Sequence, residues 1–109
     1  MTFHKYILNA DGVPVIEDDV FRWAEWFEKD ENRIVAKTEI SPEVSVSTIF
    51  LGLDHNYFSV GEPVLWETMI FGGILHHEMW RYSSREAAVE GHDFAVFLAK
   101  EELAHANQC

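Results

Sequence analysis

Six residues whose side chains could do chemistry lie at the ends or in the middle of apolar segments of the chain. They are Asp54, His55, Glu67, Arg81, Tyr82 and His92. Carboxylates, imidazoles and an arginine brought together could form a metal site, an acid–base site or an anion-binding pocket. Polar groups within buried segments cost free energy unless they have partners. We therefore predict that these six residues form a candidate ligand-binding pocket.

Several of these residues have an alternative role that is purely structural. Asp54 could cap a turn at Asn56, and Glu67 could form an ion pair with Arg81 on a neighbouring strand. His92 could donate a hydrogen bond to a strand carbonyl. The sequence alone leaves these alternatives open beside the functional ones.

An enzyme is the second class of function that these side chains allow. A small hydrolase or a metal-dependent enzyme would use Asp54, His55, Glu67 and His92. Metal binding by His55, Glu67 and His92 has no support from a spacing such as HExxH. A serine nucleophile has no support either, because the chain has no GxSxG sequence. We therefore assign no catalytic residue, no metal ligand and no cofactor.

Two short apolar runs, Val46–Leu53 and Val64–Phe71, are the segments that must position these residues. Both are rich in β-branched and aromatic residues, and turn-forming residues separate them, which predicts two strands of one sheet. Glu67 shares a strand face with two apolar residues. We expect a buried carboxylate there, with Arg81 or a histidine as its partner.

Weaker patterns predict the other elements. The sequence SSRE favours a capping box with Ser83 as the N-cap, and Gly91 inside the following helix suggests a close approach to a strand. The order of elements predicts one α+β domain over residues 1–109, in which an antiparallel sheet has two helices packed on one face. The additional strands are expected at Lys5–Asn9, 13–15, Asn32–Ile40 and His76–Tyr82, and the helices at Val20–Lys29 and Ser84–Leu103.

Composition limits the kinds of protein that the chain can be. Its 109 residues, 48% of them hydrophobic, suffice for one modest core. No apolar run reaches the roughly 18 residues that a membrane span needs. The single cysteine, Cys109, cannot form an intramolecular disulfide. We expect a cytoplasmic protein that does not contact a membrane.

Charge is the strongest compositional signal. Nineteen acidic and eight basic residues give a formal net charge of −11. Such a chain repels phosphates, so we expect no direct binding of nucleic acid. Its acidic segments could imitate nucleic acid or bind a basic partner, which gives a second candidate surface. The residues of this surface are Glu25, Glu28, Asp30 and Glu31.

The strings STIFLGLDH, GEPVLWETMIFGG and RYSSREAAVEGH, together with FRWAEWF, run through most of the chain. They resemble a widespread family of small uncharacterised proteins from tailed phages and prophages. The resemblance implies a phage origin and a shared α+β fold, and it implies no activity. The matching positions are Ser47, Thr48, Leu51, Gly52, Asp54, His55, Glu67, Thr68, Met69, Arg81, Tyr82, Gly91 and His92.

These observations together favour binding over catalysis. We expect a small acidic phage-type accessory protein that inhibits or sequesters a component of a host defence system. It would act as an anti-CRISPR protein or as a sponge for a signalling nucleotide. The expected partner is therefore a host protein or an anionic small molecule, and Arg81 would hold the latter. The sequence leaves a homodimer open.

Overall fold

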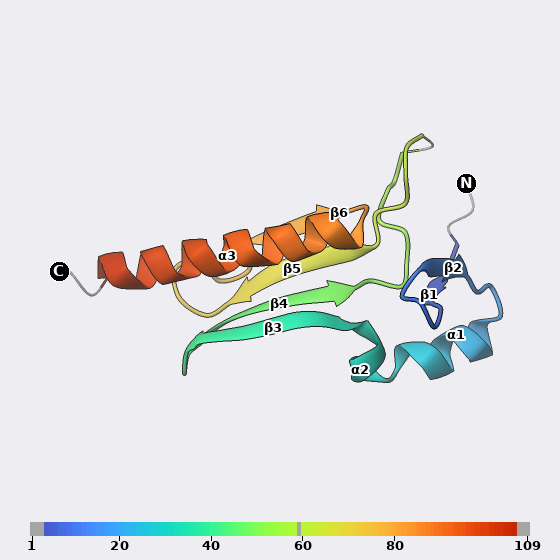
Figure 1. The fold of residues 1–109 in the computed structure, drawn as a ribbon, viewed down its shortest axis with the longest axis horizontal. Helices are drawn as coiled ribbons and strands as arrows, with labels where there is room; N and C mark the ends of the chain where they lie inside the picture. The colour runs from blue at the N-terminus through green and yellow to red at the C-terminus, as the bar shows by residue number, and fades with distance from the viewer. Residues whose placement is uncertain (1–3, 59, 107–109) are drawn as a thin grey trace.

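The computed structural model describes residues 4–58 and 60–106 (Figure 1). Cys109, which we expected to form no intramolecular disulfide, lies outside this range. Two antiparallel sheets, of two and of four strands, and three helices make up the described chain. The elements are β1 (Tyr6–Leu8), β2 (Pro14–Ile16), α1 (Val20–Phe27), α2 (Asp30–Arg33), β3 (Ile34–Ser41), β4 (Val44–Phe50), β5 (Trp66–Phe71), β6 (Met79–Tyr82) and α3 (Arg85–Ala106).

The larger sheet is a meander in which sequence neighbours are also neighbours in space. Its strand order is β3-β4-β5-β6, and every pairing is antiparallel. The smaller sheet is the β1–β2 hairpin, which joins the end of β4 through a bridge between Lys5 and Leu53. The backbone N–H of Tyr6 also donates to the Gly52 carbonyl at 2.8 Å. The predicted α+β class is confirmed.

Burial alternates along β4, as the sequence of that strand requires. Its buried residues all face α3, and the residues between them are only half-buried. An antiparallel sheet with one face on the core and one face toward solvent has this period of two. The buried set is Val44, Val46, Thr48 and Phe50, and the half-buried set is Ser45, Ser47 and Ile49.

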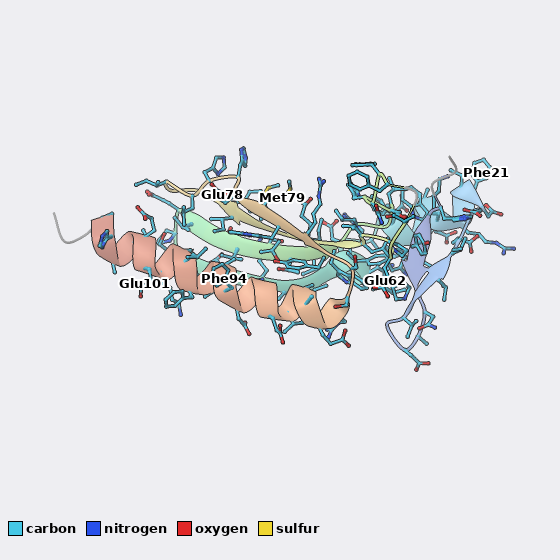
Figure 2. The ribbon with its side chains drawn as sticks, turned by 90° about the horizontal axis from the view of Figure 1, so that it is seen from above. Phe21, Glu62, Glu78, Met79, Phe94 and Glu101 are labelled. Atoms are coloured by element: carbon cyan, nitrogen blue, oxygen red, sulfur yellow. The ribbon has the colours of Figure 1, made fainter. Side chains whose placement is uncertain are left out.

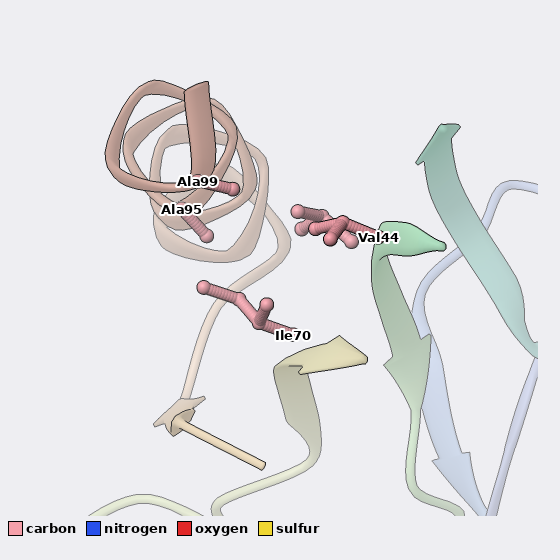
Figure 3. Packing of buried hydrophobic residues seen from close by; sticks show 5 residues of the cluster. Val44, Ile70, Ala95 and Ala99 are labelled. Atoms are coloured by element: carbon pink, nitrogen blue, oxygen red, sulfur yellow. The ribbon is translucent and has the colours of Figure 1, made fainter. Parts of the chain in front are cut away.

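Small side chains let α3 lie close to the sheet. Ala95 and Ala99 are buried and point toward Val44 and Ile70 (Figure 3). Ala88 joins a second cluster that is richer in aromatic side chains, at the other end of the sheet. Because alanine adds little width to a helix, its backbone can approach the strands, and the buried area comes mainly from the strand side chains.

The first helix occupies a different place from α3. Asp19 caps α1 by accepting from the amides of residues 21 and 22. The helix packs chiefly against β1 and α2. Its Trp23 indole N–H donates to the carbonyls of Tyr6 and Gly52, each at 3.2 Å. We expected both helices on one face of the sheet, and in the structure α3 crosses the sheet while α1 lies beside the hairpin (Figure 1).

The main differences from the predicted boundaries occur where the backbone turns. The last predicted strand begins at Met79 rather than His76, because the chain turns between β5 and β6 with His77 at φ +73°. Gly72 in this turn lies against the carbonyl of Glu43, where a Cβ atom would collide. The N-cap of α3 is Ser84 rather than Ser83, since its hydroxyl accepts from the amide of residue 87 at 3.1 Å.

The molecule is elongated. Its principal extents are 53 × 29 × 21 Å and its radius of gyration is 15.6 Å, against about 13 Å for an ordinary domain of this length. The 22-residue helix α3 extends along the long axis, and its C-terminal end lies at one end of the molecule. The β1–β2 hairpin with α1 lies at the other end (Figure 1). A two-layer arrangement therefore leaves one face of the four-stranded sheet without a covering element among the described residues.

Gly91→Ala should destabilise the protein, although alanine in a helix is normally about 1 kcal/mol better than glycine. A Cβ atom at residue 91 would collide with the phenol of Tyr82, and overpacking of this kind typically costs about 1–3 kcal/mol. Urea unfolding measures the change. Glu90→Ala, at the exposed neighbouring position, is the control and should change stability by less than about 0.5 kcal/mol. Stabilisation by Gly91→Ala would contradict this packing.

Candidate functional site

The six residues predicted to form one pocket lie in three separate places. Asp54 and His55 belong to the loop after β4. Glu67 and Arg81 lie on the sheet face that points away from α3. Tyr82 and His92 lie on the side that α3 covers. Neighbouring residues of a strand point to opposite faces, so these three groups cannot converge on one ligand in this arrangement.

The Asp54–His55 pair holds the loop between β4 and β5. The Asp54 carboxylate accepts from the backbone N–H of Asn56 at 2.7 Å and of Val64 at 2.9 Å. The His55 ring Nδ1 donates to the carbonyl of Leu53 at 2.9 Å. The turn-capping role that we considered for Asp54 is confirmed, and both side chains are engaged in loop structure.

Glu67 and Arg81 form the ion pair that the sequence suggested. Arg81 Nε lies 3.0 Å from Glu67 Oε2, and the two residues are register partners on β5 and β6. The Glu67 side chain is 12% exposed and that of Arg81 is 35% exposed. The carboxylate is therefore partly buried, and the guanidinium already has a negative partner at short range.

His92 lies at the centre of a buried hydrogen-bond network between α3 and the sheet. Its Nδ1 hydrogen-bonds with the Thr48 hydroxyl at 2.8 Å, and its Nε2 hydrogen-bonds with the Thr38 hydroxyl at 2.9 Å. Thr48 also bonds to the hydroxyl of Thr68 at 2.6 Å. His92 is only 4% exposed. We considered a strand carbonyl as its partner, and the partners are threonine hydroxyls on β3 and β4.

Burial also changes how readily His92 takes up a proton. Removal from water lowers the pKa of the His92 imidazole below its ordinary value, and the carboxylate of Asp93 opposes that effect more weakly. The ring therefore favours its neutral form, which donates through one nitrogen and accepts through the other. This is the environment of a structural histidine that couples helix to sheet.

Two buried donors near this network have no acceptor among the described residues. They are the indole N–H of Trp66 and the hydroxyl of Tyr82, which are neighbours across β5 and β6. Tyr82 packs its ring against the backbone of α3 at Gly91. An unsatisfied buried donor costs roughly 1–3 kcal/mol, so both side chains are retained here at some expense in stability.

The predicted acidic surface lies on α1, α2 and the turn between them. All four of its residues, Glu25, Glu28, Asp30 and Glu31, are exposed. Asp30 forms an exposed ion pair with Arg33, at 2.8 Å, and the same arginine stacks over the ring of Phe27. This surface is thus available to solvent, with one of its carboxylates already paired.

Sequence reasoning missed a larger surface, which we call the open face. It is the face of the four-stranded sheet opposite α3. Strand alternation was the signal that could have found it, because every member occupies the position next to a residue whose side chain points toward α3. The open face consists of Lys37, Glu39, Ser45, Ser47, Ile49, Glu67, Met69, Phe71, Met79 and Arg81.

Of the hollows between the described residues, two lie away from the open face. One is an apolar pocket of about 130 Å³ between the C-terminal half of α3 and the β5–β6 turn. The other is a wider cleft of about 860 Å³ between the β1–β2 hairpin and the N-terminal end of α3. Residues 4–58 and 60–106 contain no group of three or more His, Cys, Asp or Glu side chains placed to hold a metal ion. Within the same ranges, no helix combines the length and apolar character that crossing a membrane requires.

Comparisons with protein-family models, with curated proteins and with solved structures gave no match for this chain.

Lowering the pH should destabilise the protein through His92. The folded-state pKa lies below the unfolded-state value, so the unfolded chain binds more protons as the pH falls below about 6.5. The stability that neutral His92 contributes is fully present above that pH. It is lost progressively as the pH falls toward the folded-state pKa of His92. Urea unfolding at several pH values from about 7 to about 5 measures how the free energy of unfolding changes with pH.

His92→Asn is the control for this pH dependence, because it keeps a polar side chain and removes the titrating group. The variant should be less stable at neutral pH and should show a shallower loss of stability on acidification than the wild type. If His92→Asn lost stability with falling pH as steeply as the wild type, the assignment of this pH dependence to His92 would be wrong.

Breaking the Glu67–Arg81 pair should cost less than breaking a fully buried pair. Both side chains keep some exposure, and we expect about 1 kcal/mol from Glu67→Gln. A double-mutant cycle with Arg81→Met should give a coupling free energy of roughly 0.5–1 kcal/mol. A coupling near zero would show that the two charges do not interact in solution.

Proposed function

We propose that this chain acts without catalysis, by binding a partner protein through the open face of its four-stranded sheet. The observation that carries the proposal is a group of four large apolar side chains on this uncovered face. An antiparallel sheet that turns one face to solvent usually places polar residues there. Here Ile49, Met69, Phe71 and Met79 lie there, with Phe71 41% and Met79 40% exposed. Figure 2 shows Met79 on the side of the sheet away from α3.

The type of side chain on this face also favours binding. Met69 and Met79 are register neighbours on β5 and β6. Methionine is unbranched and polarizable, so a methionine pair adapts to the shape of an apolar partner surface. Contiguous apolar patches of this kind on small proteins commonly mark interaction sites.

Charge distribution points the same way. The open face holds two basic residues, Lys37 and Arg81, and two acidic ones, Glu39 and Glu67, so it is balanced in a chain whose net charge is −11. A partner with basic residues around an apolar element would be attracted by the whole molecule and would dock on a face whose own charges balance.

The geometry favours binding over the enzyme alternative. Asp54 and His55 hold a loop, Glu67 pairs with Arg81, and His92 is buried under α3. A hydrolase would need these groups within hydrogen-bond reach of one substrate.

A signalling-nucleotide sponge has less support than a protein inhibitor. An anionic ligand would need Arg81, and the carboxylate of Glu67 lies 3.0 Å from its Nε. The resemblance to phage proteins and the strong negative charge together favour an accessory protein that inhibits a component of a host defence system. A protein that normally binds nucleic acid is the kind of target that an acidic inhibitor suits.

Replacing two apolar residues of the open face should abolish capture of the partner. Phe71→Ser with Met79→Ser removes the two most exposed apolar side chains of the face. Phe97→Ser is the matched control, since Phe97 is 57% exposed on α3. Affinity capture from lysate of a bacterial host, followed by mass spectrometry, compares the three proteins. We expect one partner to be retained by the wild type and by the control and to be lost from the double variant.

Three outcomes would overturn this proposal. Equal capture by all three proteins would exclude the open face. Light scattering that shows a dimer in the wild type and a monomer in the double variant would assign the face to a second copy of the chain. Chemical change of the captured partner or of an added nucleotide would favour the enzyme alternative.

A further inference from the structure

The cleft of about 860 Å³ is formed by three segments that are distant in sequence. They are the turn of the β1–β2 hairpin, the end of the loop before β5, and the first turn of α3. In Figure 1 the loop after β4 lies between the hairpin and the N-terminal end of α3, and Figure 2 places Glu62 in the same region. The volume is in the range of pockets that bind ligands, roughly 300–1,000 Å³.

Part of the cleft wall is apolar. Tyr6, Pro14, Pro63, Leu65 and Trp66 line it. Prolines lack a backbone N–H and present a rigid apolar ring, and an aromatic side chain adds a flat surface. Such walls suit an extended peptide, because its alternate side chains can contact them without requiring a regular element in the partner.

The rim of the cleft is acidic. Asp11, Glu62 and Glu86 lie on three different segments of it, and Arg85 is the one basic residue that lines it in the described part of the chain. All four residues are exposed. Carboxylates spread over three segments match a ligand with several separated positive charges better than a single small cation.

Trp66 supplies an independent observation. It is 3% exposed and lines the cleft, and its indole N–H has no acceptor among the described residues. A peptide backbone offers a carbonyl acceptor at every residue. The nitrogen is shielded from solvent in the unbound protein, so a peptide carbonyl reaches it only when the cleft wall shifts, and satisfying the donor then recovers free energy that the unbound protein forgoes.

We propose that this cleft binds an extended segment of a protein, in which basic side chains alternate with small apolar ones. The apolar side chains contact the walls, and the basic side chains pair with the acidic rim. The site is distinct from the open face, with which it shares no residue. It is also distinct from the acidic surface of α1 and α2.

A short labelled peptide in which arginine alternates with valine is the probe, and the same peptide with glutamate in place of arginine is the counter-probe. Fluorescence anisotropy measures binding to the whole chain. The cleft variant is Asp11→Asn with Glu62→Gln, and the control is Glu25→Gln with Glu31→Gln. Each pair removes two negative charges from the net −11, so the two differ only in where the charges lay.

We expect the arginine peptide to bind the wild type and the control equally, to bind the cleft variant about tenfold more weakly, and to lose affinity with added salt. The glutamate peptide should not bind. Binding to the Phe71→Ser, Met79→Ser variant should be unchanged, so failure of this site and failure of the open face are distinguishable.

An equal loss in both charge variants would overturn the proposal, because it would indicate non-specific attraction to an acidic protein. A loss in the control alone would assign the peptide to α1 and α2, and no binding to the wild type would remove the site. Amide chemical shifts supply a second measurement. The largest changes on peptide addition should fall at Gly12, Leu65 and Ser84, and changes centred elsewhere would also overturn the proposal.

Discussion

The hydrogen-bond network around His92 is the interaction on which the rest of the structure depends. It joins one residue of α3 to hydroxyls on β3 and β4, and continues to Thr68 on β5. Buried polar chains of this kind are favourable only when their partners are in place, so they specify one arrangement of the elements. The network therefore fixes both the position of α3 along the sheet and the identity of the face that α3 covers. The open face follows, because it is the other side of the same strands.

Much of the fold could be predicted because its signals are local. The alternation of β4 and the apolar run of β5 placed the two central strands correctly within a few residues. The end of the turn between β5 and β6 could not be placed, since the turn closes with a positive φ at His77, which is not a glycine. The position of α1 could not be predicted either. It depends on hydrogen bonds from Trp23 to the backbone of residues 6 and 52, and no sequence period encodes such contacts.

The candidate site was predicted less well than the fold, for a reason of strand geometry. The Glu67–Arg81 pair could be foreseen, because both residues lie on neighbouring strands. Grouping them with His92 relied on their positions near strand ends and ignored the faces. Glu67 and Thr68 are adjacent and point to opposite sides, and it is Thr68 that shares the network with His92. The cleft could not be foreseen at all, since three distant segments build it.

Under the proposed function, the division of the sheet into two faces separates stability from binding. Residues that hold the fold lie under α3, where histidine and threonines are fully engaged and alanines permit close packing. Residues available to a partner lie on the open face, or at the cleft. The charge of −11 opposes non-specific association, and the edge strand β3 carries Lys37 and two register shifts that discourage edge pairing. An apolar sheet face is therefore tolerable in this molecule without a covering helix. Few side chains both hold the fold and face a partner. Substitutions on the open face should therefore alter the proposed binding of a partner while leaving the network under α3 intact.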